Sequence, residues 1–285
     1  MKIGVLGLIV SDLADVNYNK IRFAAELGFH GLGAHLTVPA GDIPRHRATA
    51  AVSVIADQGL DFLQLWGVYP CIISPDQTMR REGVRQAQDI VKLAAHMGVP
   101  GAGVRPTSLN PRWEWAPHPD NHKPETEDRL VKSLREILAT AGDLDVNIVL
   151  EMHQTTTLNT PQTIKRVIER TESNRVRVNL DSVNFISGLQ TAFHPAPVID
   201  ELFDILGPYV DTVHVKDFYL EERFVVHISE TVVGTGMMDL DTLLRRTHQL
   251  DPHGYVIIEH LPVGLVPLAK QNLTQKIRDM GLPIG

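Results

Sequence analysis

Short apolar runs alternate with longer amphipathic stretches along the whole chain. Each apolar run has the length of a β-strand and is followed by a helical pattern, which is typical of repeated βα units. Eight runs can be drawn, at residues 2–9, 31–36, 61–67, 101–106, 147–153, 176–181, 210–216 and 255–261. Spread over 285 residues, such units average about 36 residues each, the size expected in a closed α/β barrel. The pattern therefore predicts a single-domain (β/α)8 TIM barrel over residues 1–285.

Glycine and proline positions support these boundaries. Gly28, Gly59 and Gly98 stand at the ends of helical patterns, where a left-handed residue commonly ends a helix. Thr160 followed by Pro161 predicts the N-cap and the first residue of a helix. An open, doubly wound sheet is the alternative architecture, but no GxGxxG sequence follows the first apolar run.

Two long irregular stretches are expected, at residues 107–123 and 218–237. The first is rich in Pro, Trp and His, and both follow the carboxyl ends of predicted strands. Barrel enzymes build their sites at this end of the barrel, so we expect these stretches to act as lids or substrate walls.

Composition limits the partners of the chain. The formal net charge is −7, which opposes binding to nucleic acid or anionic lipid, because both need clustered Lys and Arg. Cys71 is the only cysteine, which excludes intramolecular disulfides and cysteine-rich zinc sites. The sequence has no apolar run long enough to span a membrane and no cleavage site typical of a signal peptide. We therefore expect a cytoplasmic protein whose partner is a small molecule.

Four potential metal ligands fall at the ends of four successive predicted strands: Glu151, Asp181, His214 and Glu259. They stand roughly one βα unit apart, so a barrel brings one side chain from each strand to a common point at its rim. Each residue alone is more often a helix cap or part of a surface ion pair, but carboxylates within apolar runs are costly to bury without a cation. Three carboxylates and one imidazole form a hard ligand set. The sequence thus predicts one divalent ion, with Mn²⁺ favoured over Mg²⁺ or Co²⁺.

The sequence also resembles the xylose isomerase-like barrels, a family that includes sugar isomerases and epimerases. The matching phrases are LEMH at 150–153, NLDSVN at 179–184, VHVKD at 213–217, VGTGMMDLDTLL at 233–244 and GYVIIEH at 254–260. The resemblance implies that Glu151, Asp181, His214 and Glu259 bind the metal. It also implies that Glu151 and Glu259 exchange protons with opposite faces of the substrate, as the acid and base of the reaction.

Two further residues are predicted to be catalytic. Side chains two positions apart on a strand share a face, so His153 accompanies Glu151, and Lys216 accompanies His214, toward the barrel mouth. The alternatives are a structural hydrogen bond for His153 and an ion pair with Asp217 for Lys216.

Trp66, Arg105 and Asn184 are predicted to bind the substrate. Trp66 offers an apolar wall for a sugar ring, and Arg105 could hold a carboxylate or a phosphate. The alternatives are core packing for Trp66 and a salt bridge for Arg105. Asn184 stands three residues after Asp181, where many ketose epimerases of the resembled family carry a histidine.

These features predict a metal-dependent isomerase or epimerase of a small hydroxy-carbonyl sugar or keto-polyol that acts through an enediolate. The H-x-K-D pattern at 214–217 resembles that of inosose dehydratases, so a lyase that acts on a keto-polyol or keto-glycoside is the alternative. Phosphate on the substrate is not implied, because no glycine-rich phosphate loop follows the last two strands.

Two more distant alternatives stay open. An endonuclease IV-like DNA repair enzyme shares the barrel, but the net charge of −7 opposes DNA binding. A non-catalytic binding barrel is disfavoured because all four ligand residues are present. The apolar stretch at 261–277 fits a last helix that packs on its own barrel, while a homo-oligomer and a subunit of a hetero-oligomer remain alternatives.

Overall fold

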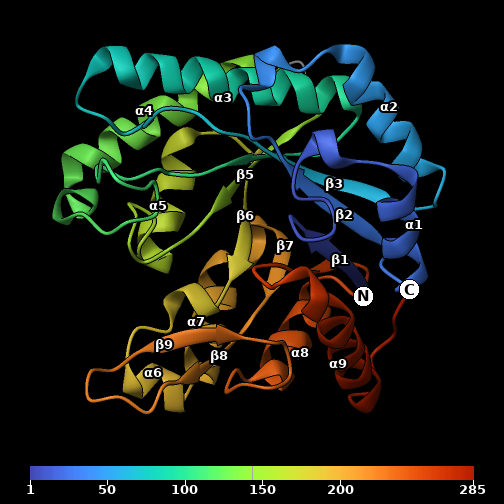
Figure 1. Ribbon diagram of the computed structural model, residues 1–285. Helices are drawn as coiled ribbons and strands as arrows, with labels where there is room; N and C mark the ends of the chain where they lie inside the picture. The colour runs from blue at the N-terminus through green and yellow to red at the C-terminus, as the bar shows by residue number, and fades with distance from the viewer. Residues whose placement is uncertain (143) are drawn as a thin grey trace.

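Eight parallel strands form a closed barrel in the computed structural model, which describes residues 1–142 and 144–285 (Figure 1). Each strand pairs with the next barrel strand along the chain, and β1 closes the ring by pairing with β10. The barrel strands are β1 (Lys2–Leu6), β2 (Gly31–His35), β3 (Asp61–Trp66), β4 (Gly101–Val104), β5 (Asn147–Glu151), β6 (Val176–Asp181), β7 (Val210–Val215) and β10 (Tyr255–Ile258). Each predicted apolar run contains one of these strands, so the predicted TIM barrel is confirmed.

Several strands end earlier than the apolar runs predicted. β1 ends at Leu6 and not at residue 9, and β5 ends at Glu151 and not at residue 153. Burial continues beyond the last ladder residue, because Ile9 and Met152 are also buried. An apolar run therefore marks the buried segment, whereas the hydrogen-bonded strand is shorter.

Helices cover the outer face of the barrel (Figure 1). The α-helices are α1 (Tyr18–Glu26), α2 (Arg45–Ala56), α3 (Gln77–Met97), α4 (Pro124–Ala141), α5 (Pro161–Thr171), α6 (Leu189–Phe193), α7 (Ala196–Leu206), α8 (Leu240–Leu250) and α9 (Val266–Asp279). Short 3-10 helices lie at Leu13–Asp15, Ala40–Asp42, Pro119–His122, Val183–Phe185, Gly207–Tyr209 and Val263–Leu265. None of the helices in the described parts of the chain has the length and apolar character that a membrane span needs.

The backbone geometry agrees with the predicted helix boundaries. Gly28, Gly59 and Gly98 have φ angles of 78°, 69° and 67°, the left-handed region that ends helices. Thr160 is the N-cap of α5, where its side chain accepts a hydrogen bond from the backbone N–H of Thr163 at 3.1 Å. These residues therefore end or begin the helices where the sequence indicated.

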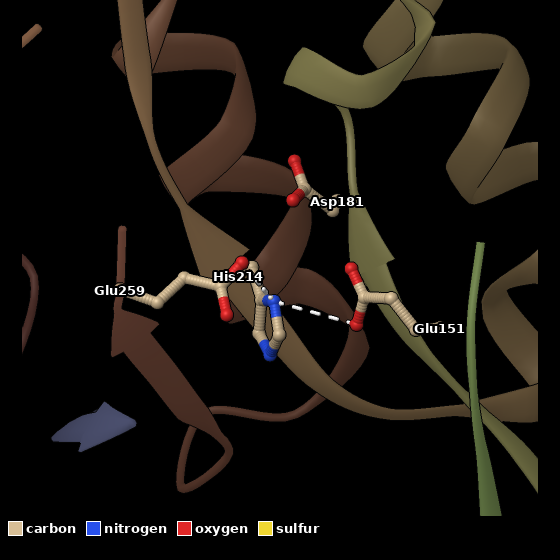
Figure 2. Close-up of side chains that lie close together, drawn as sticks. All are labelled: Glu151, Asp181, His214 and Glu259. Atoms are coloured by element: carbon tan, nitrogen blue, oxygen red, sulfur yellow. Dashed lines mark ion pairs between the residues drawn. The ribbon is translucent and has the colours of Figure 1, made fainter. Parts of the chain in front are cut away.

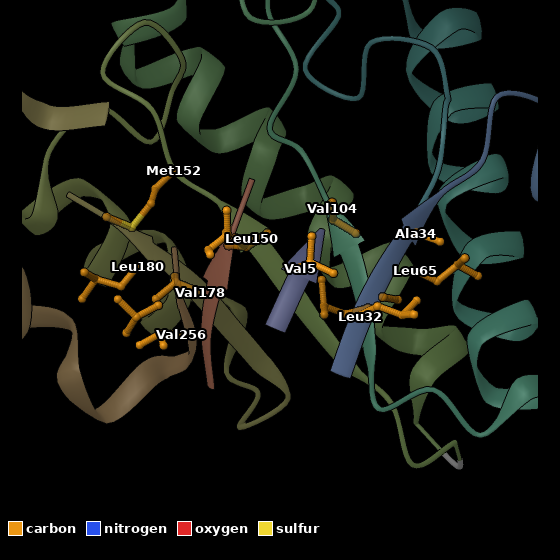
Figure 3. Close-up of a cluster of buried hydrophobic side chains, with 14 of the residues drawn as sticks. Val5, Leu32, Ala34, Leu65, Val104, Leu150, Met152, Val178, Leu180 and Val256 are labelled. Atoms are coloured by element: carbon orange, nitrogen blue, oxygen red, sulfur yellow. The ribbon is translucent and has the colours of Figure 1, made fainter. Parts of the chain in front are cut away.

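The main core lies between the barrel wall and the helices. The strand residues Leu65, Leu150 and Leu180 are fully buried (Figure 3) and belong to the same packed cluster as Ile90 of α3 and Ile168 of α5. Burying one such aliphatic side chain contributes roughly 1.5–3 kcal/mol. This layer fixes the helices on the barrel and leaves the inner face of the strands to form a second, smaller apolar cluster of Leu6, Leu63, Trp66 and Ile257.

A β-hairpin follows β7 and was not predicted. β8 (Asp217–Leu220) and β9 (Ile228–Thr231) pair antiparallel as a separate two-stranded sheet, drawn in orange outside the barrel ring in Figure 1. Residues 218–237 were expected to be irregular, and this expectation is wrong for the paired residues. Both strands have only four residues and no regular alternation of buried and exposed positions, so no period-two pattern marks them.

Candidate metal centre and adjoining cavity

Four ligand-type residues meet at the carboxyl ends of neighbouring strands (Figure 2): Glu151, Asp181, His214 and Glu259. Glu151 and Asp181 end β5 and β6, His214 lies near the end of β7, and Glu259 directly follows β10. One ligand atom from each residue lies within 4.8 Å of those of the other three, and all four side chains are buried. The barrel thus brings together the residues that the one-per-strand spacing singled out.

The donor set of this cluster fits a cation. Nδ1 of His214 lies 2.9 Å from Oε1 of Glu259 and 3.7 Å from Oε2 of Glu151. Both ring nitrogens of His214, Oδ2 of Asp181 and Oε1 of Glu259 are buried without a hydrogen bond in the described chain, and the two oxygens make only ion-pair contacts. Buried polar atoms without a hydrogen bond are costly, and a hard divalent ion would satisfy oxygens and imidazole nitrogen together.

Lys216 places an ammonium group beside the cluster. Its Nζ lies 2.7 Å from Oδ2 of Asp181 and 2.8 Å from Oε1 of Glu259, and the side chain is buried. The alternative partner Asp217 instead accepts hydrogen bonds from backbone N–H groups of residues 218, 234, 236 and 238. A metal-binding His214 is neutral, so one ammonium would then face three ionised carboxylates, and a divalent ion would supply the missing positive charge.

Burial and charge move the pKa values of this cluster in different directions. Burial raises the pKa of Glu151 to about 7. Burial also opposes ionisation of Glu259, but His214 and Lys216 outweigh it and hold the pKa of Glu259 well below its usual value. Burial opposes the charge of His214, yet Glu259 and Glu151 raise its pKa to about 9. Without a metal ion, Glu151 therefore has a higher pKa than Glu259 and is the more easily protonated of the two.

Asn184 and His153 stand beside Glu151. Nδ2 of Asn184 donates to Oε1 of Glu151 at 3.3 Å and to the carbonyl oxygen of Met152 at 3.0 Å. Nδ1 of His153 accepts from the backbone N–H of Thr155 at 3.2 Å, and burial lowers the pKa of the ring. A neutral imidazole that accepts at Nδ1 carries its proton on Nε2, so His153 has a hydrogen-bond donor left to offer.

Trp66 and Arg105 are held by neighbouring groups. Nε1 of Trp66 donates to Oε1 of Gln64 at 3.2 Å. Nη1 of Arg105 lies 2.7 Å from Oε1 of Glu114, a second guanidinium nitrogen donates to the carbonyl oxygen of Gly67, and Nε makes no hydrogen bond in the described chain. The salt-bridge alternative therefore describes part of the guanidinium, and other N–H groups, Nε–H among them, have no partner in the described chain.

A cavity of about 470 Å³ adjoins the cluster. Six residues singled out in the sequence line it, namely Trp66, Arg105, Glu151, His153, Asn184 and Glu259. The other lining residues were not predicted; they are Leu6, His35, Trp113, Trp115, Glu230 and His260. Asp181, His214 and Lys216 are not among the lining residues and are almost completely buried. The cavity and the cluster thus share Glu151 and Glu259.

The missed residues come mainly from the two long stretches and from the position after Glu259. Trp113 and Trp115 belong to 107–123, and Glu230 belongs to β9. His260 has a φ of 56°, and its Nδ1 lies 3.2 Å from Oε1 of Glu230. Trp113 and Trp115 could have been predicted as lining residues, because they lie in a stretch that was expected to form a substrate wall. The position of Glu230 depends on the pairing of the hairpin strands, which the sequence did not predict.

Comparison with known proteins agrees with this architecture. The family model described as xylose isomerase-like TIM barrel matches residues 21–277, which confirms the resemblance seen in the sequence. A search of curated proteins gave no match.

Several solved structures share the fold. A xylose isomerase-like TIM barrel protein from Mycobacterium smegmatis in complex with magnesium is 18% identical, with a TM-score of 0.74 over 98% of this chain and 97% of that chain. The 3-keto-D-glucoside 4-epimerase from E. coli is 19% identical, with a TM-score of 0.70 over 99% of each chain. The D-psicose 3-epimerase with D-tagatose from Clostridium cellulolyticum H10 is 15% identical, with a TM-score of 0.71 over 99% of this chain and 98% of that chain. At such identities the likeness establishes the fold alone.

Proposed function

The chain belongs to the xylose isomerase-like TIM-barrel family, and from this premise we propose that it is a divalent-metal-dependent isomerase or epimerase of a small hydroxy-carbonyl sugar or keto-polyol. The observation that carries the proposal is the buried cluster of three carboxylates and one imidazole beside a cavity at the barrel mouth. In support, two structural neighbours are described as sugar epimerases, a 3-keto-D-glucoside 4-epimerase and a D-psicose 3-epimerase.

The proposed metal ligands are Glu151, Asp181, His214 and Glu259. Mn²⁺ is favoured over Mg²⁺ or Co²⁺, because hard oxygen donors dominate the set while one nitrogen donor is present. When bound, the ion supplies positive charge that polarises a substrate carbonyl and stabilises the enediolate left by proton loss from the neighbouring carbon.

Glu151 and Glu259 are the proposed acid and base. Their carboxylates approach from opposite sides of His214 in Figure 2, which suits proton exchange on two faces of a bound sugar. Asn184 donates to Oε1 of Glu151, and the ammonium of Lys216 lies 2.8 Å from Oε1 of Glu259. Each carboxylate is therefore held in one orientation by a neighbouring donor.

His153, Trp66, Arg105 and Asn184 are proposed to position the substrate. His153 would donate from Nε2 to a substrate oxygen, and Trp66 would pack against an apolar ring face. Arg105 lines the cavity, and its guanidinium would donate to a substrate hydroxyl. The polar side chain of Asn184 lines the cavity while it contacts Glu151.

A lyase is the second candidate, favoured by the position of Lys216 in the H-x-K-D pattern. The first step is the same proton loss, after which a substituent on the next carbon leaves with its electron pair instead of the proton returning. Lys216 does not line the cavity, so its ammonium, 2.8 Å from Oε1 of Glu259, would act through that carboxyl group, and the proton that Glu259 has taken up would pass to the leaving oxygen. Dehydration produces an ultraviolet-absorbing enone and epimerisation does not, so product analysis separates the two reactions.

Elemental analysis tests the metal centre. After dialysis and reloading with Mn²⁺ we expect about one ion per chain, because the four ligand atoms surround a single point. His214→Ala removes the only nitrogen ligand and should lose the ion, whereas the exposed His46→Ala should retain it. Equal metal content in wild type and His214→Ala would contradict the ligand assignment.

Solvent deuterium uptake tests the acid and base. The metal-loaded protein should label a ketose beside its carbonyl, and Glu259→Gln should lower the rate by about 10²-fold or more, because an amide cannot accept the proton. Glu222→Gln, a change of an exposed glutamate on the hairpin, is the matched control. Wild-type exchange by Glu259→Gln would rule out the two-glutamate mechanism.

A further inference from the structure

The cationic side chains around the cavity are already paired with carboxylates. The pairs are Arg105 with Glu114 at 2.7 Å, Lys216 with Asp181 and Glu259 at 2.7 and 2.8 Å, and His260 with Glu230 at 3.2 Å. A divalent ion together with the Lys216 ammonium would balance the three carboxylates of the cluster and leave no excess positive charge. An anionic substrate would therefore have to break one of these pairs to find a counter-charge.

Two other histidines line the wall, His35 and His153. Burial lowers the pKa of His35 to about 4, and Nδ1 of His153 accepts a hydrogen bond from the backbone N–H of Thr155, so this nitrogen carries no proton. Within the residues that the structure describes, the cavity wall thus presents neutral donors and aromatic faces but no unpaired cation. Such a surface matches the hydroxyl groups and apolar faces of an uncharged sugar.

A second hollow of about 580 Å³ adjoins the first across one tryptophan. Trp113 lines both hollows, and the Arg105–Glu114 pair joins a wall residue of the inner cavity to one of the outer hollow. The outer hollow is also lined by Tyr69 and by Met79, which is 47% exposed, while Trp113 is 62% exposed. Exposed aromatic surface beside a binding cavity commonly marks a place where a ring of a ligand packs.

We propose that the substrate is an uncharged keto-sugar that carries a second ring. The keto-sugar ring occupies the inner cavity beside Glu151 and Glu259, and the second ring lies in the outer hollow against Trp113. Each hollow has the volume of a small-molecule site, which is about 300–1,000 Å³, so a single sugar would leave the outer hollow unused. This inference rests on the proposed function, because it places the keto group at the candidate metal centre.

Binding to four matched probes tests the inference without turnover. The probes are D-fructose, 6-O-glucosyl-D-fructose, 6-O-benzyl-D-fructose and D-fructose 6-phosphate, titrated into the Mn²⁺-loaded protein by calorimetry. At least one ringed probe should bind about tenfold more tightly than D-fructose, as stacking of one ring would provide, and the phosphate should give no such gain. The stronger of the two ringed probes shows whether the second ring is a sugar or an aromatic group.

A variant of Trp113 tests whether the tighter binding of the ringed probe depends on the outer hollow. Trp113→Ala should reduce the affinity ratio between the ringed probe and D-fructose to near one, while Phe224→Ala, which removes a fully exposed aromatic ring on the hairpin, should keep the ratio. Tightest binding of D-fructose 6-phosphate, no gain with either ringed probe, or an unchanged ratio in Trp113→Ala would each overturn the inference. Loss of metal binding or of proton exchange would instead count against the proposed function, so the two can fail separately.

Discussion

A buried hydrogen-bond network lies on the inner face of the barrel beneath the cluster. Nε2 of Gln64 donates to Oδ1 of Asn179 at 2.8 Å and to Oγ1 of Thr212 at 3.1 Å, and both Gln64 and Asn179 have no exposed surface. Oε1 of Gln64 accepts from Nε1 of Trp66, and Nδ2 of Asn179 donates to Oε2 of Glu151 at 3.3 Å. One glutamine thus connects the aromatic wall of the cavity to a candidate acid–base residue.

Replacing Gln64 should destabilise the protein. Gln64→Leu has similar volume but leaves Nε1 of Trp66 buried without its acceptor, at a cost of roughly 1–3 kcal/mol, and removes one of the two hydrogen bonds at each polar atom of Asn179. The measurement is the free energy of unfolding in urea. Gln190→Leu, the same substitution at an exposed position of α6, should stay within about 0.5 kcal/mol of wild type. Equal stability of Gln64→Leu and wild type would show that the network contributes nothing.

The candidate ligands could be predicted residue by residue, but the network could not. Glu151, Asp181 and His214 each stand at the end of an apolar run, so their spacing reports the barrel directly. Gln64 stands inside an apolar run, and its partners lie on strands more than a hundred residues away. These side chains come together only when the barrel closes. Sequence spacing predicts where each strand lies along the chain, but not which inward-facing side chains of different strands contact each other.

At the scale of elements, Asp217 braces the segment between β9 and α8. Its buried carboxylate accepts hydrogen bonds from the backbone N–H groups of Phe218, Gly234, Gly236 and Met238 at 2.9, 3.0, 2.8 and 2.9 Å. A Cβ at position 236 would overlap both the Asp217 carboxylate and the Phe218 carbonyl, so glycine is required there. The hairpin that carries Glu230 is thereby tied to the chain that leads into α8.

Replacing Asp217 should make the segment between β9 and α8 open more often. Asp217→Ala deletes four charge-assisted hydrogen bonds, each worth roughly 1.5–3 kcal/mol, so amides at 234–238 should exchange with deuterium at least about tenfold faster. Hydrogen exchange followed by mass spectrometry measures the change. Glu222→Ala at the hairpin tip is exposed and should leave the segment protected. Unaltered protection at 234–238 in Asp217→Ala would mean that other contacts hold it.

The elements of the barrel were predictable because each combines an apolar strand with an amphipathic helix. Ile90 and Ile168 belong to helices whose buried faces repeat with the helical period, and the strands that precede these helices consist mostly of apolar residues. The hairpin has neither signal. Its order comes from contacts of Asp217 with residues 17 to 21 positions later, and no local pattern reports such contacts.

At the scale of the whole molecule, several ionisable groups at the barrel mouth are shielded from solvent, among them Glu151, His214 and Glu259. His35 at the end of β2 lines the same cavity and is half-buried, and its imidazole lies directly against Gly7, whose φ is 66°. Burial lowers the pKa of His35 to about 4, against about 6.5 in an unfolded chain. The folded protein therefore binds fewer protons than the unfolded chain between these two values, so stability falls as the pH drops through this window.

Replacing His35 should flatten the pH dependence of unfolding. His35→Asn removes a group that is neutral in the folded protein and protonated in the unfolded chain. The free energy of unfolding of this variant should therefore decrease less between pH 7 and pH 4 than that of wild type. The difference should be at most about 1.4 kcal/mol per pH unit. Urea unfolding at several pH values in the presence of a chelator measures this slope. His30, whose pKa burial also lowers, is present in both proteins, so the difference between the two slopes isolates His35. The exposed His46→Asn should keep the wild-type slope, and an equally steep slope in His35→Asn would mean that His35 can take up a proton in the folded barrel.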